Sequence, residues 1–446
     1  MNKNRLSVMA SIVMAMLVAA MDTTITNTTM PVIADELGRM ELYAWTFAAY
    51  MIFSTVLSPV AGRISDLYGR KKVFSAGILL FLFGSLLCGS ADTMLQLVLF
   101  RAVQGIGAGV MMPFPAIIAG DLFSVEKRGR IQAFFTGMWG LSAIIAPLLG
   151  SLFVEYATWR WIFYVNIPIC LLSILLLLPY KEVYEPKRAP VDVGGALLFT
   201  AGVSLMLLTT VVERGVALYL AGGLALMAAF YYYEKRHRSP IVPLALLRNK
   251  PVAWLIVNSF LSCAALFGAG SYLPLYLQNE GFSIFLSGVA MLGMTFGWMA
   301  MAVPAGKWIL RFGYRPLMIA GNAVLVASAV WFMFIGSFSG FWFVFLGSIP
   351  LGVAFGLLST VAIIGVQQLV EPHQKGISTS LQMFSRNIGT AVGITLMGAF
   401  IYRTANMTDG FQAMFAYGFF VSLLSLAGSF LIRDRAPQPS AASPSR

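Results

Sequence analysis

Long apolar runs recur along the whole chain, and they constrain its fold more than any other feature. Each run has about 20 residues, enough for a helix rising about 1.5 Å per residue to cross roughly 30 Å of hydrocarbon. Backbone amides in lipid must be paired within their own segment, and the runs lack the alternation of barrel strands. Only 11% of the 446 residues are charged and 59% are apolar. The sequence therefore predicts an all-α integral membrane protein.

Fourteen membrane-spanning helices are predicted from these runs. The first run is too long, and too well supplied with Thr and Asn, for a cleaved signal peptide, so we count it as helix one. The predicted spans cover about residues 6–33, 44–61, 73–91, 94–120, 131–154, 160–179, 194–212, 215–233, 252–277, 285–305, 316–336, 340–368, 377–401 and 411–432.

Basic residues are unevenly distributed between the connections. Of the 30 Lys and Arg residues, 24 fall in the amino terminus, the even-numbered connections and the carboxyl tail. The odd-numbered connections hold only Arg39, Arg160, Arg214 and Arg403. Because an excess of Lys and Arg marks cytoplasmic segments, we expect both termini in the cytoplasm and the chain in the plasma or inner membrane. The net charge of +12 then faces lipid headgroups, and nucleic acid is not an expected partner.

Residues for metal, redox or hydrolytic chemistry are scarce. Cys88, Cys170 and Cys263 lie inside predicted spans without a C-x-x-C pattern, and His237 and His373 lie in connections. A metal site or a histidine-dependent hydrolase has almost nothing to be built from. We therefore expect no metal, no cofactor and no enzymatic activity.

A charged loop, Gly62–Lys72, carries five of the chain's few charges and has a faded second copy at Gly306–Arg315. Gly62, Gly69 and Gly77 recur at Gly306, Gly313 and Gly321, always 244 residues later. Both copies lie between the second and third helices of a six-helix set, which indicates a duplicated bundle. The predicted organisation is two six-helix bundles at 1–180 and 251–433, linkers and an inserted hairpin (about 194–233) within 181–250, and a disordered cytoplasmic tail at 434–446.

The inserted hairpin has few polar residues. We therefore expect it to lie at the periphery and to face lipid rather than the transport path.

Asp22 is the only carboxylate well inside a predicted span, where a charge costs on the order of 2.5–3.5 kcal/mol by insertion scales. Burial and a nearby arginine shift a carboxylate's proton affinity in opposite directions, so such a residue can load and release a proton. Helical rise places Arg101 at a depth where it can pair with Asp22. Two interpretations stay open, a proton or substrate role for Asp22 and a fixed ion pair that joins helices one and four.

Further polar residues inside spans are candidates for a substrate cavity. Ser378, Gln382, Arg386 and Thr390 form a stripe at i+4 spacing, which either lines a water-filled path or packs against a polar neighbour. The complete set of cavity candidates is Thr26, Asn27, Tyr50, Gln104, Trp139, Asn258, Tyr272, Gln278, Gln382 and Arg386. Taken singly, Tyr50, Gln104, Trp139, Asn258, Tyr272 and Gln278 are better explained by helix packing or an interface than by a cavity.

Several motifs resemble the major facilitator superfamily, and within it the fourteen-span drug:proton antiporter family of multidrug efflux transporters. They are the charged loop, Asp22–Pro31 in helix one, Leu99–Gly109 in helix four, Gly140–Ser151 in helix five, and Trp159–Pro168, with Arg386–Gly389 as a further similarity in helix thirteen. In helix five Gly140, Pro147 and Gly150 match the antiporter motif, whereas Ala146 and Ser151 replace its usual glycines.

This resemblance implies a role for the charged loop. Asp66 would dock on the amino terminus of helix thirteen near Gly376, where unpaired amides favour an anion, and Arg70 would bridge to Asp121. With Gly62 and Gly69, these residues would form a gating latch. In a different interpretation, the basic residues of the loop only fix topology.

The predicted function is proton-coupled export of small amphipathic or cationic compounds by alternating access, driven by the proton gradient and carried out by a monomer. A dedicated exporter of one metabolite or antibiotic is the alternative, and an uptake symporter is a third. A polytopic enzyme or lipid-handling sensor would need a nucleophile, an acid-base pair or a metal cluster, and the sequence offers none.

Overall fold

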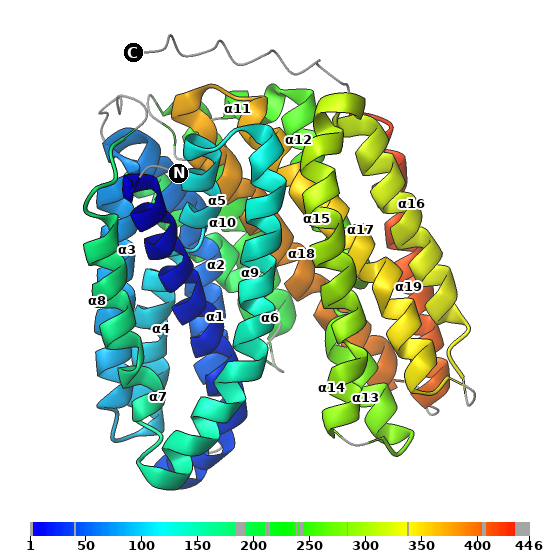
Figure 1. Cartoon of the computed structure of the whole chain (residues 1–446), viewed down its shortest axis with the longest axis horizontal. Coiled ribbons are helices and arrows are strands. Elements are labelled where there is room, and N and C mark those ends of the chain that lie inside the picture. Colours follow the sequence, from blue (N-terminus) through cyan, green and yellow to red (C-terminus); the bar gives the residue numbers. More distant parts are fainter. Residues whose placement is uncertain are drawn as a thin grey trace. The chain divides into compact units, whose positions relative to one another are not determined.

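The computed structural model describes residues 3–432, apart from 40–41, 183–191, 210–211, 213–214, 238–239, 241, 243, 283, 337–338 and 404–406. Within these residues the regular structure is helical throughout, and no strand is found (Figure 1). The predicted disordered tail at 434–446 lies outside the described residues. The helices pack into two compact units, which we describe one at a time.

Unit 1 consists of Met1–Leu122, Phe134–Leu246 and Glu371–Ala391. It therefore contains most of the first predicted bundle, the inserted hairpin, and the first half of a helix from the second bundle. Its helices are α1 (Lys3–Leu37), α2 (Tyr43–Tyr68), α3 (Arg70–Gly89), α4 (Met94–Met111), α5 (Phe114–Leu122), most of α6 (Val125–Tyr156), α7 (Trp161–Tyr164), α8 (Asn166–Leu177), α9 (Val193–Leu208), α10 (Val216–Arg236), η2 (Pro372–Gln374) and the start of α18 (Lys375–Arg403).

Unit 2 consists of Phe123–Ala133, Leu247–Val370 and Val392–Arg446. It contains the start of α6 and the end of α18. Its other helices are α12 (Lys250–Leu266), α13 (Ala269–Asn279), α14 (Ile284–Ala290), α15 (Leu292–Phe312), α16 (Tyr314–Met333), α17 (Phe341–Gln368) and α19 (Met407–Ser429), with the short α11 (Leu244–Arg248) where the two units divide.

Some predicted spans consist of two helices rather than one. The span at 94–120 is interrupted at Met112–Pro113, between α4 and α5. Pro113 has no amide hydrogen, so it cannot continue the hydrogen-bond ladder of α4. The span at 252–277 divides in the same way at Phe267–Gly268, between α12 and α13. Apolar length alone could not reveal these interruptions.

Glycines allow the closest helix approaches in each unit. In unit 1, a side chain at Gly107 of α4 would overlap the backbone of Phe81 in α3, and one at Gly105 would overlap Tyr50 in α2. In unit 2, a side chain at Gly352 of α17 would overlap the backbone of α15. The glycines of the helix-four motif therefore serve close helix packing, as small residues do in membrane proteins.

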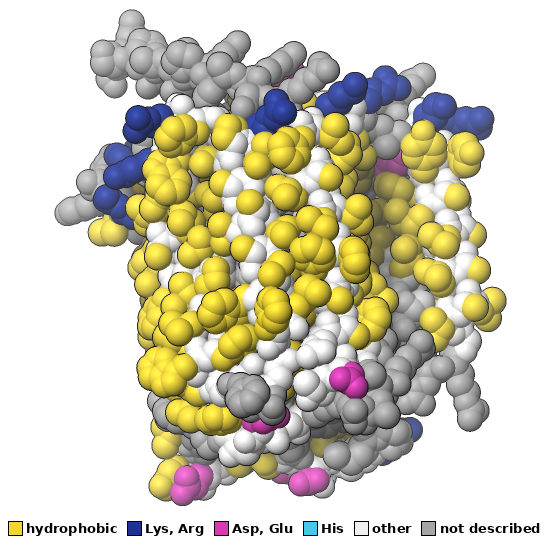
Figure 2. Space-filling view, turned by 90° about the vertical axis from the view of Figure 1, so that its right-hand side faces the viewer, with side chains coloured by type: hydrophobic (Ala, Val, Ile, Leu, Met, Phe, Trp, Pro, Cys, Tyr) yellow, Lys and Arg dark blue, Asp and Glu magenta, His cyan; other side chains and the backbone are white. Residues whose placement is uncertain are grey.

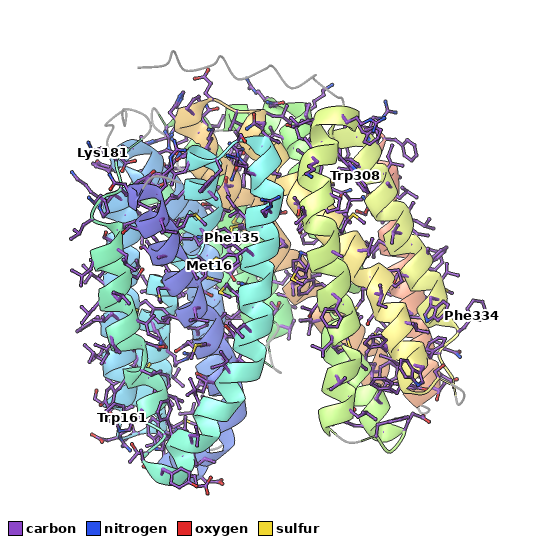
Figure 3. The ribbon with its side chains drawn as sticks, in the orientation of Figure 1. Met16, Phe135, Trp161, Lys181, Trp308 and Phe334 are labelled. Atoms are coloured by element: carbon purple, nitrogen blue, oxygen red, sulfur yellow. The ribbon has the colours of Figure 1, made fainter. Side chains whose placement is uncertain are left out.

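Length and composition make much of the chain suitable for a membrane. Nine helices among the described residues are long and apolar enough to span, and three shorter apolar helices cover Trp161–Leu177, Val193–Leu208 and Lys250–Leu266. Figure 2 shows a face covered by hydrophobic side chains, with Lys and Arg along its upper edge. Large side chains such as Trp161 and Phe334, 51% and 76% exposed, lie at the periphery of their units (Figure 3). Such surfaces suit contact with lipid.

The inserted hairpin, α9 and α10, has one exposed and one packed face. Leu197 and Leu218 are 65% and 77% exposed. On the other side, Phe199 and Val203 of α9 and Phe230 of α10 are buried, and α9 packs against α2. The hairpin is thus an attached part of unit 1, with an apolar outer surface.

Candidate functional site

A buried polar cluster lies inside unit 1, on four helices. Asp22 comes from α1, Ser85 from α3, Arg101 and Gln104 from α4, and Asn166 from the first turn of α8. Each of these side chains is at most 1% exposed. The long apolar stretches on either side of each residue bring the four helices together, and their few polar positions meet at this point.

Asp22 is the centre of the cluster. Its Oδ2 accepts a hydrogen bond from Arg101 Nη1 at 2.6 Å, and its Oδ1 accepts from Gln104 Nε2 at 2.7 Å and from Asn166 Nδ2 at 3.2 Å. Gln104 in turn accepts from Arg101 Nη1 at 2.6 Å and donates to Ser85 Oγ at 2.8 Å. The network stabilises the ionised carboxylate, because every contact to it comes from a donor.

Arg101 is held by more than its ion pair. Its guanidinium carbon lies 4.2 Å from the ring centroid of Tyr50 on α2, a cation–π distance. Arg101 Nε has no hydrogen-bond partner within the described residues, although it is buried. Thr26, one turn after Asp22 on α1, likewise has a buried Oγ1 without a partner there. A compensated ion pair with spare donors beside it can exchange partners at lower cost than a fully satisfied one.

The two charges of this cluster are buried together. Asp22 and Arg101 neutralise each other, which reduces the cost of burying both charges. Among the described residues no group of three His, Cys, Asp or Glu side chains could hold a metal ion.

A second charged cluster lies in the segment Gly62–Lys72. The sequence predicted a loop here, but the segment is helical apart from Gly69, because α2 continues to Tyr68 and α3 begins at Arg70. Asp66 is 1% exposed, and its two carboxylate oxygens accept hydrogen bonds from the backbone amides of Gly376 at 3.0 Å and Ile377 at 2.8 Å. These amides belong to the first turn of α18, where backbone donors lack partners within the helix. The helix dipole adds to the attraction for an anion there.

Arg70 joins Asp66 to Asp121. Its Nη1 donates to Asp66 Oδ1 at 2.7 Å and its Nε donates to Asp121 Oδ2 at 2.7 Å, while the side chain itself is fully buried. Lys375, the first residue of α18, lies 3.6 Å from the other oxygen of Asp121. Two carboxylates and two cations from α2, α3, α5 and α18 therefore balance one another. We call Asp66, Arg70 and Asp121 the latch.

Two glycines shape the backbone at the latch. Gly69 has φ of +102°, ends α2 and precedes α3, in a conformation that other residues rarely adopt. Gly62 packs so closely on α18 that a side chain would overlap Ser380 and the carbonyl oxygen of Gly376. The end of α2 can approach α18 this closely because position 62 lacks a Cβ, whereas Gly69 permits the turn into α3.

The stripe on α18 is partly buried in unit 1. Ser378 and Gln382 are inaccessible to solvent, Arg386 is half-buried, and Thr390 donates to the carbonyl oxygen of Arg386 at 3.1 Å. The stripe therefore contacts protein on at least part of its length.

Several cavity candidates lie away from the Asp22 cluster. Asn258 is buried in unit 2 and donates to the carbonyl oxygen of Ser425 at 2.8 Å and to Ser429 Oγ at 3.2 Å. Tyr272 donates to the carbonyl oxygen of Ile394 at 2.9 Å. Gln278 is exposed near the end of α13, and Trp139 is 40% exposed on α6. These contacts give Asn258 and Tyr272 a role in helix packing, which the sequence analysis had set beside a cavity role.

For the helix-five motif, the structure describes only part of the predicted set. Gly140 and Gly150 lie on α6, and Gly150 is buried. The side chains of Asn27 and Pro147, although on helices, lie outside the described residues.

Sequence reasoning missed two members of the Asp22 cluster, Ser85 and Asn166. Asn166 lies within the motif Trp159–Pro168, so it was visible as a polar residue between apolar ones. Ser85 had no such signal, because small hydroxyl residues are frequent in these helices. The cluster around Asn258 was also missed. It includes Asn322 of α16, which donates to Asn258 Oδ1 at 3.2 Å and to Ser429 Oγ at 2.7 Å.

Comparison with known proteins agrees with this architecture. The model of the Major Facilitator Superfamily matches residues 12–303 and 288–446. Multidrug resistance protein 3 of Bacillus subtilis is 30% identical over 433 residues, which cover 91% of this chain and 82% of that protein. Multidrug transporter protein MdtP of the same organism is 29% identical over 406 residues, covering 89% and 75%. The crystal structure of the human organic anion transporter MFSD10 superposes with a TM-score of 0.67 at 18% identity, covering 96% of this chain and 99% of that one.

Proposed function

The chain belongs to the major facilitator superfamily of membrane transporters, and we propose that it exports small amphipathic or cationic compounds in exchange for protons. The observation that carries this proposal is the buried Asp22–Arg101 pair, an ionised carboxylate and its partner deep inside a helical bundle. The similarity to proteins named as multidrug transporters supports the choice of cargo.

Proton coupling follows from competition for Asp22. With Arg101 at 2.6 Å, the carboxylate holds its charge and no proton. When the helices shift and no compound is bound, Arg101 can turn toward Tyr50, whose ring already lies against it. Asp22 then binds a proton, because an unpaired buried carboxylate is neutral at lower cost. Entry of a cationic compound that pairs with the carboxylate, or return of Arg101, releases the proton, so that proton and compound alternate at one site.

The latch supplies the conformational part of the cycle. Asp66, Arg70 and Asp121 join helices of the first sequence repeat to the first turn of α18, a helix of the second repeat. Opening that end of the protein requires the amides of Gly376 and Ile377 to leave Asp66. We propose that the latch stabilises the state in which this end is closed, and that it is released when the site opens there.

The proposal includes the topology. The apolar helices described above, together with α6 and α18, would form fourteen spans, with both termini in the cytoplasm and the latch at the cytoplasmic end. Since the gradient of protons supplies the energy, no further cofactor is needed, and a monomer is sufficient.

Transport into or out of proteoliposomes with an imposed pH gradient tests the proposal. Ethidium and a panel of amphiphilic dyes serve as probes. The wild-type protein should move at least one dye at a rate that follows the gradient, and Asp22→Asn should abolish that dependence. Asp92→Asn, whose carboxylate is 81% exposed, is the matched control and should behave as wild type. Gradient dependence that survives in Asp22→Asn would exclude the coupling role, and a panel of inactive dyes would favour a dedicated exporter.

A further inference from the structure

The inserted hairpin α9–α10 contacts α2 and α18, the two helices that Asp66 of the latch joins. We propose that it acts as a second, apolar clasp on the latch, holding the start of α18 against α2 through Phe199. This inference rests on the proposed alternating function, and it assigns a role to a segment for which the sequence indicated only a peripheral position.

Phe199 is the main contact. It is 3% exposed, and its ring lies 5.3 Å from that of Phe230 on α10 and 5.2 Å from that of Phe384 on α18. Ser380 of α18 packs on Gly62 of α2. Phe384 lies one helical turn after Ser380. The contact between Phe199 and Phe384 therefore lies about two turns beyond the amides that Asp66 holds, and one turn beyond the residue that packs on Gly62.

The hairpin is also tied to α2. Helix α9 packs against α2. Arg63, near the end of α2, donates through Nε to the carbonyl oxygen of Pro240 at 3.1 Å, and Pro240 lies just after α10. Arg63 also interacts electrostatically with the buried Glu234 of α10 and with Asp66. One basic residue thus connects the segment that follows the hairpin with the charged end of α2.

The start of α9 is fixed as well. Asp192 caps the helix, accepting a hydrogen bond from the amide of Gly195 at 2.7 Å, and lies 3.4 Å from His237 Nδ1 at the end of α10. The ends of the two helices are therefore joined to each other near Arg63. A rigid hairpin is needed if its packing on α2 is to restrain α18.

The strengths of these attachments differ, which predicts how the hairpin moves. An extended helix face and a hydrogen bond join it to α2, whereas the ring of Phe384 is the aromatic contact with α18. When the first turns of α18 leave Asp66, the hairpin should stay with α2 and separate from Phe384. Loss of that contact would favour the open latch.

Cross-linking tests the separation directly. Phe199→Cys is combined with Phe384→Cys in one protein and with Phe230→Cys in the other, in a background with alanine at Cys88, Cys170 and Cys263. A short bis-methanethiosulfonate reagent joins the thiols and a reductant releases them. The 199–384 cross-link should stop ethidium transport until it is reduced, and the 199–230 cross-link, which lies within the hairpin, should not. Transport that continues with 199 joined to 384 would overturn the proposal.

A second measurement does not need transport. Ser380→Cys reports the latch, because this position is buried against Gly62 when the latch is closed. Adding Phe199→Ala should increase its labelling rate by N-ethylmaleimide about five-fold, since an aromatic contact on the closed state is lost. Leu197→Ala, on the exposed face of the same helix, is the control and should leave the rate unchanged. Equal labelling rates in the two variants would refute the clasp, whether or not the protein transports ethidium. If the labelling rates differ about five-fold but the wild type transports no dye, the proposed cargo is wrong and the clasp stands.

Discussion

The two copies of the loop between helices two and three keep the same turn and differ in its charges. Gly69 and Gly313 each separate two helices, with φ of +102° and +79°. Asp66, Arg70 and Asp121 of the first copy correspond, 244 residues later, to Leu310, Tyr314 and Gly365. Leu310 is 40% exposed, and a side chain at Gly365 would contact the ring of the buried Tyr314. Duplication has preserved the glycine with positive φ at the turn. Only the first copy carries the carboxylate that binds the amides of α18.

The same contrast is found elsewhere. In unit 1 the ionised pair Asp22–Arg101 lies within a network of amides and a hydroxyl, whereas the deep polar cluster of unit 2, around Asn258 and Asn322, is neutral. A second pair of contacts shows the same contrast. In the first repeat, Arg160 donates to the carbonyl oxygen of Ala91. Gln412 donates to the corresponding carbonyl, that of Ile335, in the second. The first repeat carries charge where the second carries neutral hydrogen bonds, so coupling and switching should depend on the first repeat.

The sharpest test of this comparison is Arg70→Ala. It leaves the buried carboxylates of Asp66 and Asp121 without their shared partner, and breaking a buried pair costs about 3–5 kcal/mol. We expect a large fall in thermal stability in detergent and loss of transport. Arg311→Ala removes an exposed arginine from the second copy and should change the melting temperature little. Comparable losses in both variants would contradict the one-sided latch.

Gly69→Ala and Gly313→Ala test what the two copies share. Both positions have positive φ, and strained backbone of this kind costs about 1–3 kcal/mol in residues with a Cβ. Denaturation monitored by circular dichroism should show similar destabilisation for the two variants. A clear effect at Gly69 with none at Gly313 would mean that the second copy no longer needs its turn.

Asn258→Ala tests whether the neutral polar cluster of unit 2 serves stability alone or also the proposed proton coupling. It removes hydrogen bonds to the carbonyl oxygen of Ser425 and to Ser429 Oγ, and each unsatisfied buried group costs about 1–3 kcal/mol. Stability should fall while the pH-gradient dependence of the remaining transport is unchanged. If Asn258→Ala abolished that dependence at unchanged stability, the neutral cluster would have a share in coupling.

The smallest effect is expected at Glu36, which lies 3.0 Å from Arg160. The nearby Trp159 side chain and the Arg160 guanidinium, which donates to Oε1, lower the pKa of Glu36 below its usual value. The contact therefore contributes stability above pH 4.5, the ordinary pKa of the group, and loses it as the pH falls through the lowered value. Because the pair is exposed, the contribution is at most about 1 kcal/mol. Melting temperatures at pH 7 and pH 3.5 should differ slightly less in Glu36→Gln than in wild type, and an equal difference would assign no stability to the pair.

Much of the fold could be predicted, because membrane helices must satisfy their backbone internally and apolar runs record them one by one. The interruption at Pro113 and the division at Phe267 leave no mark in a continuous apolar run, so apolar length could not predict them. At Pro113 the missing amide hydrogen was a separate signal that the count of apolar residues did not use. The site was predicted to a similar degree. Asp22 and Arg101 were identifiable because charge is rare in a span, whereas Ser85 and Asn258 are too ordinary in type for their contacts to be inferred.

The sequence by itself determined a helical membrane protein, a duplicated segment between its second and third helices, and the few ionisable residues inside its spans, since charges in lipid are costly. Composition and spacing did not decide what most of those residues contact, and for Asp66 and Arg70 only the family resemblance implied partners. Helices hundreds of residues apart had to pack before Asp66 could meet the amides of Gly376 and Ile377, and before Phe199 could meet Phe384. Such partners are set by the geometry of packed helices, which no local pattern records.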